Sequence, residues 1–339
     1  MSQSEFTMII DAHAHITGPA ELYKFTRELA ASTGPMRPQR PQFSDELVEQ
    51  SLTAHLEEVR GVGTDLQVAS PRPWAIPNAE RREAAVVTIT QTVNDMIAQC
   101  VRLHPEAFRG VAGLPQVPHL SPKFCVEELE RCVKELGFVG CKINPDPGEG
   151  GSEVPHMGDE YWYPLYEKMV ELDVPGLVHG GPFRFSREPE LGYFCTEETV
   201  AAFGVLRSRV LQDFPTLKLI IGHGGGYLPY QVGRARAFRL NEGARGGNTE
   251  SFDLSMKRLY YDTVLYNIES LELLFKVVGV DQCLFGSDKP ANGSAKDPET
   301  GRSLNDIKPM IEAIPWLTAE HKAAIYEGNA RSLYSRLSI

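Results

Sequence analysis

The sequence lacks any apolar run that approaches the roughly 20 residues needed to span a bilayer as a helix. Its start, Met1 to Met8, also lacks the basic residues, apolar stretch and small-residue cleavage site of a secretory signal. Basic residues are outnumbered, with 34 Lys and Arg against 45 Asp and Glu, and they form no basic stripe. We therefore expect neither membrane insertion nor nucleic-acid binding, although a few converging arginines would still let an acidic chain bind a small anion.

The six cysteines include no CxxC pair and no closely spaced framework. In a chain of 339 residues without a visible signal, they predict reduced thiols and a cytoplasmic location. Hydrophobic residues make up 42% of the chain and charged residues 23%, which is an ordinary globular composition with enough apolar material for a core. No repeat, low-complexity tract or linker divides the sequence, so we expect a single domain over residues 1–339.

Eight short apolar segments alternate with longer amphipathic ones. The expected strands are Met8–His15, Asp65–Ser70, Phe108–Leu114, Phe138–Asn144, Pro175–His179, Leu217–His223, Arg258–Thr263 and Gln282–Ser287. The expected helices are Asp45–Arg60, Ala79–Leu103, Ser121–Gly137, Tyr161–Leu172, Thr196–Asp213, Leu228–Leu240, Ile268–Val278 and Ser303–Ala313. Several strands are continuous apolar runs, which is typical of a parallel sheet buried on both faces. Eight strands that alternate with helices predict an α/β fold of the (β/α)₈ TIM-barrel type. An open dinucleotide-binding sheet is the less favoured alternative, because no GxGxxG motif follows the first strand.

Two segments extend this pattern. Residues 17–43 follow the first strand and carry several prolines and arginines, so we expect a loop insertion that acts as a lid over the barrel mouth. Residues 318–337 are predicted to form two extra C-terminal helices, suited to closing the barrel bottom or to contacts between copies of the chain.

Polar side chains stand at the ends of four expected strands. His13 and His15 close the first strand, and because one residue separates them, both imidazoles point to the same side of a strand. His179, His223 and Asp288 close the fifth, sixth and eighth strands. The carboxyl ends of barrel strands form the face where such enzymes place their chemistry. Four imidazoles and one carboxylate at that face suit Zn²⁺ or a similar divalent ion.

The set of motifs resembles the amidohydrolase superfamily. The run His223-Gly224-Gly225-Gly226 with Arg234 in the following helix, together with Gly286-Ser287-Asp288, is similar to the amidohydrolase-2 branch. That branch includes aminocarboxymuconate semialdehyde decarboxylase and hydroxybenzoate-type decarboxylases. Longer stretches resemble 4-oxalomesaconate hydratase, namely Glu128–Glu135, Trp162–Leu172 and Asp297–Gly301.

The resemblance implies a metal-dependent lyase of aromatic-compound catabolism that acts on a small unsaturated or aromatic carboxylate. It implies that His13, His15, His179 and Asp288 hold one divalent metal, Zn²⁺ or alternatively Mn²⁺. His223 would then be the outer general acid or base, and Asp288 would be a second catalytic group. A homodimer or higher homo-oligomer is expected.

Two departures from the hydratase-like sequences lie beside the expected metal. Position 288 is Asp, as in the decarboxylases, where the hydratase branch is expected to have Glu. Gly180 and Gly181 follow His179, where hydratase-like sequences carry a polar segment with a Cys. Both departures favour decarboxylation as the reaction, whereas the long similarity outside the site favours hydration of 4-oxalomesaconate or a similar intermediate as the alternative.

Lys142, in the fourth strand, leaves three hypotheses open. It could bind a substrate carboxylate, pair with Asp146, or become carboxylated and bridge two metals, which would make the protein a binuclear hydrolase. Arginines recognise carboxylates through two parallel hydrogen bonds. The candidates for substrate binding are Arg72, Arg184 and Arg234, with Arg187 ranked below them.

Overall fold

The computed structural model describes residues 8–33, 39–77, 79–151, 154–181, 190–245 and 249–338. Its eight strands are β1 (Ile10–Ile16), β2 (Leu66–Pro71), β3 (Phe108–Ala112), β4 (Gly140–Ile143), β5 (Gly176–Val178), β6 (Leu219–Ile221), β7 (Tyr260–Asp262) and β8 (Cys283–Leu284). All pair in parallel and in chain order. Backbone bonds of 2.8 Å from Ala12 N to Phe285 O and from Asp288 N to His13 O link β1 to the segment around the end of β8. The sheet is therefore a nearly closed barrel, and the predicted (β/α)₈ fold is confirmed.

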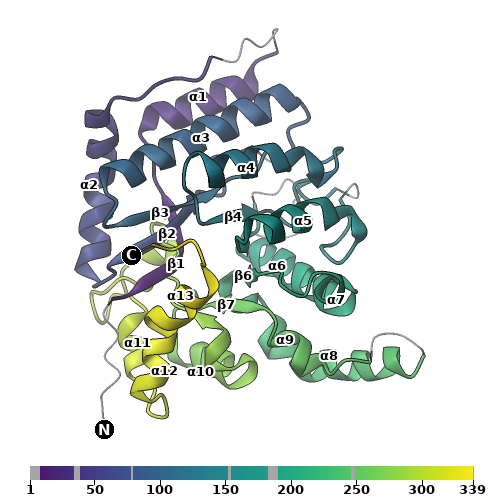
Figure 1. The fold of residues 1–339 in the computed structure, drawn as a ribbon. Helices are drawn as coiled ribbons and strands as arrows, with labels where there is room; N and C mark the ends of the chain where they lie inside the picture. The colour runs from purple at the N-terminus through teal and green to yellow at the C-terminus, as the bar shows by residue number, and fades with distance from the viewer. Residues whose placement is uncertain are drawn as a thin grey trace.

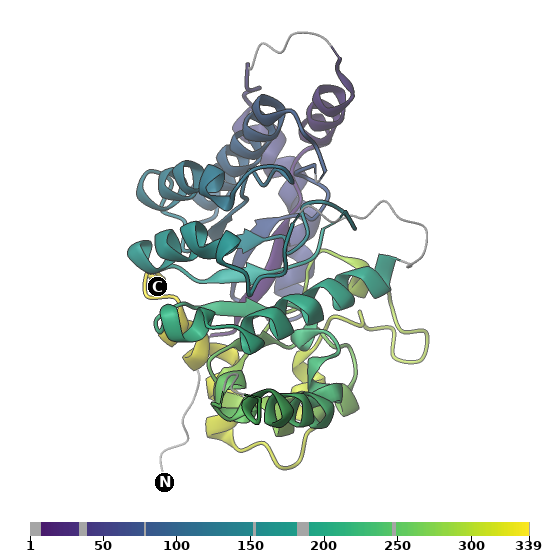
Figure 2. The same ribbon diagram turned by 90° about the vertical axis from the view of Figure 1, so that its right-hand side faces the viewer.

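Helices surround the strands (Figures 1 and 2). They are α1 (Ala20–Ala31), α2 (Asp45–Gly61), α3 (Glu83–Leu103), α4 (Val126–Lys134), α5 (Tyr163–Leu172), α6 (Glu190–Arg207), α7 (Val210–Asp213), α8 (Leu228–Gly243), α9 (Phe252–Met256), α10 (Ile268–Val278), α11 (Lys308–Glu312), α12 (Ala319–Ala323) and α13 (Asn329–Leu333). The expected helix Ile268–Val278 is found with the same ends as α10, and most of the others are present with shifted ends. The expected helix Thr196–Asp213 is divided between α6 and α7, and Ser303–Ala313 is helical only over α11. In α3 the predicted apolar stripe faces the core, since Ala85, Ile89, Val93 and Ile97 are buried. Within the described residues, no helix combines the length and apolarity that a membrane crossing needs.

The segment after β1 differs from a plain loop. It contains α1, whose Leu22 is buried. At the end of this helix the Arg82 guanidinium donates to the carbonyls of Leu29 and Ala30 at 3.3 and 2.7 Å. The Leu29 carbonyl also accepts from the backbone N–H of Ser32, so both terminal carbonyls have donors. A lid function for residues 17–43 stays a prediction.

The C-terminal helices close the bottom of the barrel. Ala330, Leu333 and Tyr334, in and just after α13, are buried against interior side chains from the first halves of the strands, including Ile10 and Leu66. Apolar side chains therefore fill the lower barrel, which leaves the opposite end, where the strands finish, as the face for polar chemistry.

Candidate metal centre

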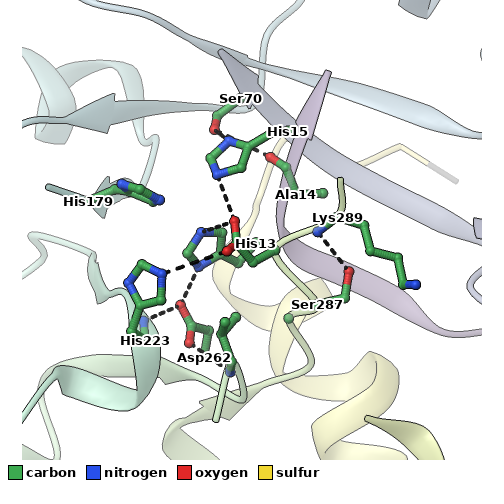
Figure 3. Close-up of polar contacts among 12 residues, drawn as sticks. His13, Ala14, His15, Ser70, His179, His223, Asp262, Ser287 and Lys289 are labelled. Carbon is green, nitrogen blue, oxygen red and sulfur yellow. Dashed lines mark hydrogen bonds and ion pairs between the residues drawn. The ribbon is translucent and has the colours of Figure 1, made fainter. Parts of the chain in front are cut away.

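Four side chains from three strand ends meet at the barrel mouth. They are His13 and His15 from β1, His179 after β5 and Asp288 after β8, and all four residues are buried. One ligand atom from each lies within 4.8 Å of the others. This spacing is close to that of ligands held about 2.0–2.2 Å from one shared ion. Figure 3 shows the imidazoles of His13, His15 and His179 around one space.

A β-bulge in β1 aims both of its histidines into the barrel. The register with β2 shifts between Asp11 and Ala14. Ile10 and Ala12 pack in the barrel interior, whereas Ala14, after the shift, belongs to the outer core. The bulge therefore changes which positions face inward. Up to the bulge these are the even-numbered Ile10 and Ala12, and after it they are the odd-numbered His13 and His15. The prediction that the two imidazoles share one side is confirmed, but their direction depends on this local irregularity.

Each histidine of the cluster is oriented by a partner at Nδ1. His13 Nδ1 lies 2.6 Å from Asp262 Oδ2, and His179 Nδ1 lies 2.6 Å from the carbonyl of Gly180. His15 Nδ1 lies 2.9 Å from Ser70 Oγ, whose own hydrogen is directed to the Ala14 carbonyl. Because these partners accept, Nδ1 carries the proton in each ring and Nε2 keeps its lone pair, as metal-binding imidazoles require.

The Nε2 atoms are the strongest evidence that the cluster fits a metal. Those of His13 and His15 are fully buried and have no hydrogen-bond partner among the described residues. Asp288 Oδ1 lies 3.0 Å from His15 Nε2 and 3.6 Å from His13 Nε2. Burying such nitrogens unpaired is costly. A divalent ion bound by three imidazoles and one carboxylate would remove that cost.

The electrostatics mostly favour the protonation states that a metal needs. Burial lowers the pKa of His15 to about 4 and that of His179 well below its usual range. Burial raises the pKa of Asp288, but the surrounding imidazoles of His15, His223 and His13 outweigh it and hold that pKa well below the usual value. For His13, burial lowers the pKa, but the Asp262 and Asp288 carboxylates together raise it above its usual value. Neutral imidazoles and an ionised carboxylate are the forms that coordinate a cation.

His223 stands beside the cluster. Its Nε2 lies 3.8 Å from Asp288 Oδ2, and its ring centre lies 5.2 Å from that of His13. Gly224, Gly225 and Gly226 all have positive φ angles, so glycine is needed for the turn that brings His223 back to the barrel axis. Asp262 secures the turn by accepting from the backbone N–H groups of His223 and Gly224, both at 3.0 Å. Burial lowers the pKa of His223, but Glu198 and Asp288 raise it well above its usual range.

Lys142 lies next to the cluster and is buried. Its Nζ donates to the carbonyl of Pro71 at 2.9 Å, and with His179 and Gly180 it lines a small cavity. Burial lowers its pKa to about 7 against the opposing effect of Asp288. Among the described residues it forms no ion pair with Asp146, whose carboxylate accepts from Gly148 N and Tyr193 Oη instead. That hypothesis for Lys142 is therefore wrong.

The predicted arginines have different positions. Arg72 follows β2 and donates to the Pro290 carbonyl at 2.9 Å and to Thr17 Oγ1 at 3.3 Å, near the barrel mouth. Arg234 is exposed on α8, with its guanidinium 5.6 Å from the Phe238 ring centre, outside the metal cluster. Arg184 and Arg187 lie outside the described residues. A role in substrate binding stays a prediction for all four.

Several residues of the site were not predicted. Asp262 had a signal, because it ends a strand as the predicted ligands do. Glu198 had none, since it lies inside a helix. Phe194, also on α6, has its ring 5.7 Å from that of His179, and the half-exposed Trp74 lies 6.1 Å from Phe194. These two rings form an apolar wall beside the cluster.

Comparisons with known proteins identify the family of the chain. A family model described as amidohydrolase matches residues 10–336. The curated 2-keto-4-carboxy-3-hexenedioate hydratase of Sphingobium sp. is 37% identical over 335 residues, 97% of each chain. The gamma-resorcylate decarboxylase of Polaromonas sp. is 30% identical over 272 residues, 74% of this chain and 80% of the relative.

Solved structures give the same two groups of enzymes. The 4-oxalomesaconate hydratase of Rhodopseudomonas palustris has a TM-score of 0.84 and 35% identity, with 97% of this chain and 96% of that chain covered. A dihydroxybenzoic acid decarboxylase of Polaromonas sp., solved with manganese, has a TM-score of 0.72 and 22% identity, with 97% of each chain covered. The latter likeness shows the shared fold.

Proposed function

The chain belongs to the amidohydrolase family, and we propose that it is a metal-dependent hydratase that adds water to the double bond of a small unsaturated polycarboxylate. The observation that favours hydration is the 37% identity with a hydratase over 97% of both chains. The two departures noted at positions 180 and 288 favoured decarboxylation from sequence alone. We give the identity over 97% of both chains more weight than these departures, because they concern a few positions beside the expected metal.

Four residues would hold the metal in this proposal: His13, His15, His179 and Asp288. A divalent ion there, with Zn²⁺ as the first choice, would supply Lewis-acid polarisation of a substrate oxygen and of water. His223 carries the proton chemistry, because its Nε2 faces the cluster without belonging to the ligand set. The Glu198 carboxylate favours the protonated imidazole, so His223 is suited to deliver a proton to one carbon of the double bond. The water oxygen bonds to the neighbouring carbon, and the proton that this water releases restores the protonated imidazole.

The surrounding side chains select the substrate. The Lys142 ammonium is placed to pair with a substrate carboxylate, since among the described residues only the Pro71 carbonyl accepts from it. Arg72 offers a second cation at the same mouth. The rings of Phe194 and Trp74 keep water from one side of the site and match a flat, conjugated substrate. A cytoplasmic location and a homo-oligomer remain predictions.

Decarboxylation is the second candidate, because Asp288 and the 30% identity with a decarboxylase both favour it. The deciding experiment incubates the purified protein with 4-oxalomesaconate and, separately, with hydroxybenzoates and carboxymuconate semialdehydes. It records loss of the conjugated absorbance, released CO₂ and incorporation of solvent deuterium at carbon. We expect hydration of the unsaturated polycarboxylate without CO₂. Release of CO₂ from an aromatic acid, with no hydration, would establish the second candidate instead.

Removing the charge of Lys142 should change the pH dependence of substrate capture. Because the pKa of Lys142 is lowered to about 7, the amine is charged below pH 7 and neutral above it. We expect kcat/KM for an anionic substrate to fall as the pH rises through about 7. Lys142→Met should lower kcat/KM by roughly 10–100-fold at pH 6, the value of one charged hydrogen bond, and abolish that fall.

Lys218→Met is the matched control, because Lys218 pairs with Asp173 away from the barrel mouth. Its kcat/KM should follow the wild-type profile. If the alkaline fall persisted unchanged in Lys142→Met, Lys142 would not be the group that binds the substrate anion.

A further inference from the structure

A buried carboxylate on α6 contacts two parts of the site at once. Glu198 is fully buried, and both of its carboxylate oxygens lie 2.9 Å from His223 Nδ1. Its Oε1 also accepts from the backbone N–H of Gly180 at 3.2 Å. One side chain from outside the barrel therefore joins the loop after β6 to the residue that follows His179.

The position of this carboxylate is fixed by the packing of α6 on the turn formed by Gly224, Gly225 and Gly226, here called the glycine turn. Thr199, the next residue, accepts from the backbone N–H of Tyr227 at 2.8 Å. A Cβ at Gly226 would collide with the carbonyl of Cys195 and the hydroxyl of Thr199. The turn thus contacts the helix on both sides of Glu198, at the Cys195 carbonyl and at the Thr199 hydroxyl, and the carboxylate has little freedom to move away from His223.

The chemical consequence concerns which nitrogen of His223 carries a proton. An ionised carboxylate only accepts hydrogen bonds, so Nδ1 must donate and must keep its proton. Nε2 is then left to exchange protons at the side that faces Asp288 and the metal cluster. A neutral His223 with its proton on Nε2 would break the contact with a buried carboxylate, which is costly.

We propose that Glu198 is a positioning residue for His223: it fixes the Nδ1–H tautomer, aims Nε2 at the substrate and holds the Gly180 backbone beside the metal ligand His179. The proposal rests on the proposed function only in that His223 is the group that moves a proton. Glu198 itself does not belong to the cluster of His13, His15, His179 and Asp288.

The test compares Glu198→Gln with the wild type in three measurements. Gln has the same shape, but its amide can donate to Nδ1 and so permit the opposite tautomer. We expect an unchanged metal content, a kcat lower by at least ~10²-fold and a KM within about twofold of wild type. In the substrate-free enzyme, at a pH high enough to leave the His223 ring neutral, ¹⁵N-imidazole NMR should show its proton on Nδ1 in the wild type and shifted toward Nε2 in Glu198→Gln. The His223 signal is identified by its absence in His223→Ala.

Glu128→Gln is the matched control, because Glu128 is also a buried helical carboxylate but bonds Arg131 and Asn94 away from the site. It should leave kcat and the His223 signal unchanged. Glu198→Asp keeps the charge on a shorter side chain, so it should keep the Nδ1 proton and give an intermediate kcat. The proposal is overturned if Glu198→Gln leaves the His223 tautomer and kcat as they are, or if its activity falls only in proportion to lost metal. Because the NMR signature needs no substrate, failure of the hydratase assay alone would leave this test intact.

Discussion

Replacing His179 with Ala is expected to give a folded protein that no longer retains the metal. His179 approaches the cluster from β5, opposite the two ligands on β1, and its ring is held by the bond from Nδ1 to the Gly180 carbonyl. Without it, three ligands remain and two of them come from one strand. Loss of a Lewis acid worth several kcal/mol should lower kcat/KM by ~10³-fold or more.

The measurement is metal content after dialysis, paired with activity under the same conditions. His119→Ala is a suitable control, because His119 lies in the loop after β3 near Glu83 and has a third of its side chain exposed. It should keep both metal and activity. If His179→Ala retained a full equivalent of metal, His179 would have to be removed from the ligand set.

Replacing His223 with Ala should have the opposite signature. His223 lies next to the cluster, but its Nε2 is 3.8 Å from the nearest Asp288 oxygen and its Nδ1 is committed to Glu198. We expect the metal to stay while kcat falls by ~10²–10⁴-fold, the usual contribution of a positioned proton carrier. Metal content and kcat, measured on the same preparation, decide the outcome. Should His223→Ala lose the metal while His179→Ala keeps it, the roles of ligand and proton carrier would be reversed.

The strand ends explain how much of the site could be predicted. In a parallel barrel all carboxyl ends meet on one face, so His13, His179 and Asp288 could be brought together from residues far apart in sequence. The structure gathers them with His15 within 4.8 Å. The strand cores were also predictable, because their apolar runs are continuous. Their ends were less so, since several paired segments are only two to four residues long, as in β5 and β8.

What could not be predicted depends on contacts between distant elements. The bulge in β1 follows from its pairing with β2, which a single strand does not reveal. Glu198 lies in a helix whose place over the glycine turn is set by tertiary packing. Arg234 shows the converse. Its place in the helix after His223 could be predicted from the sequence, whereas the structure was needed to show that its side chain is exposed and lies outside the metal cluster. Helix α1 was hidden by the prolines that flank it within residues 17–43.

The most direct test of a single metal centre is a metal titration of the chelator-treated wild-type enzyme, scored by elemental analysis and by hydration of 4-oxalomesaconate. We expect the metal-free protein to be inactive, and activity to return in proportion to added divalent ion until one equivalent is bound per chain. Full activity without metal, or a requirement for two equivalents with a carboxylated Lys142, would contradict a mononuclear centre held by His13, His15, His179 and Asp288.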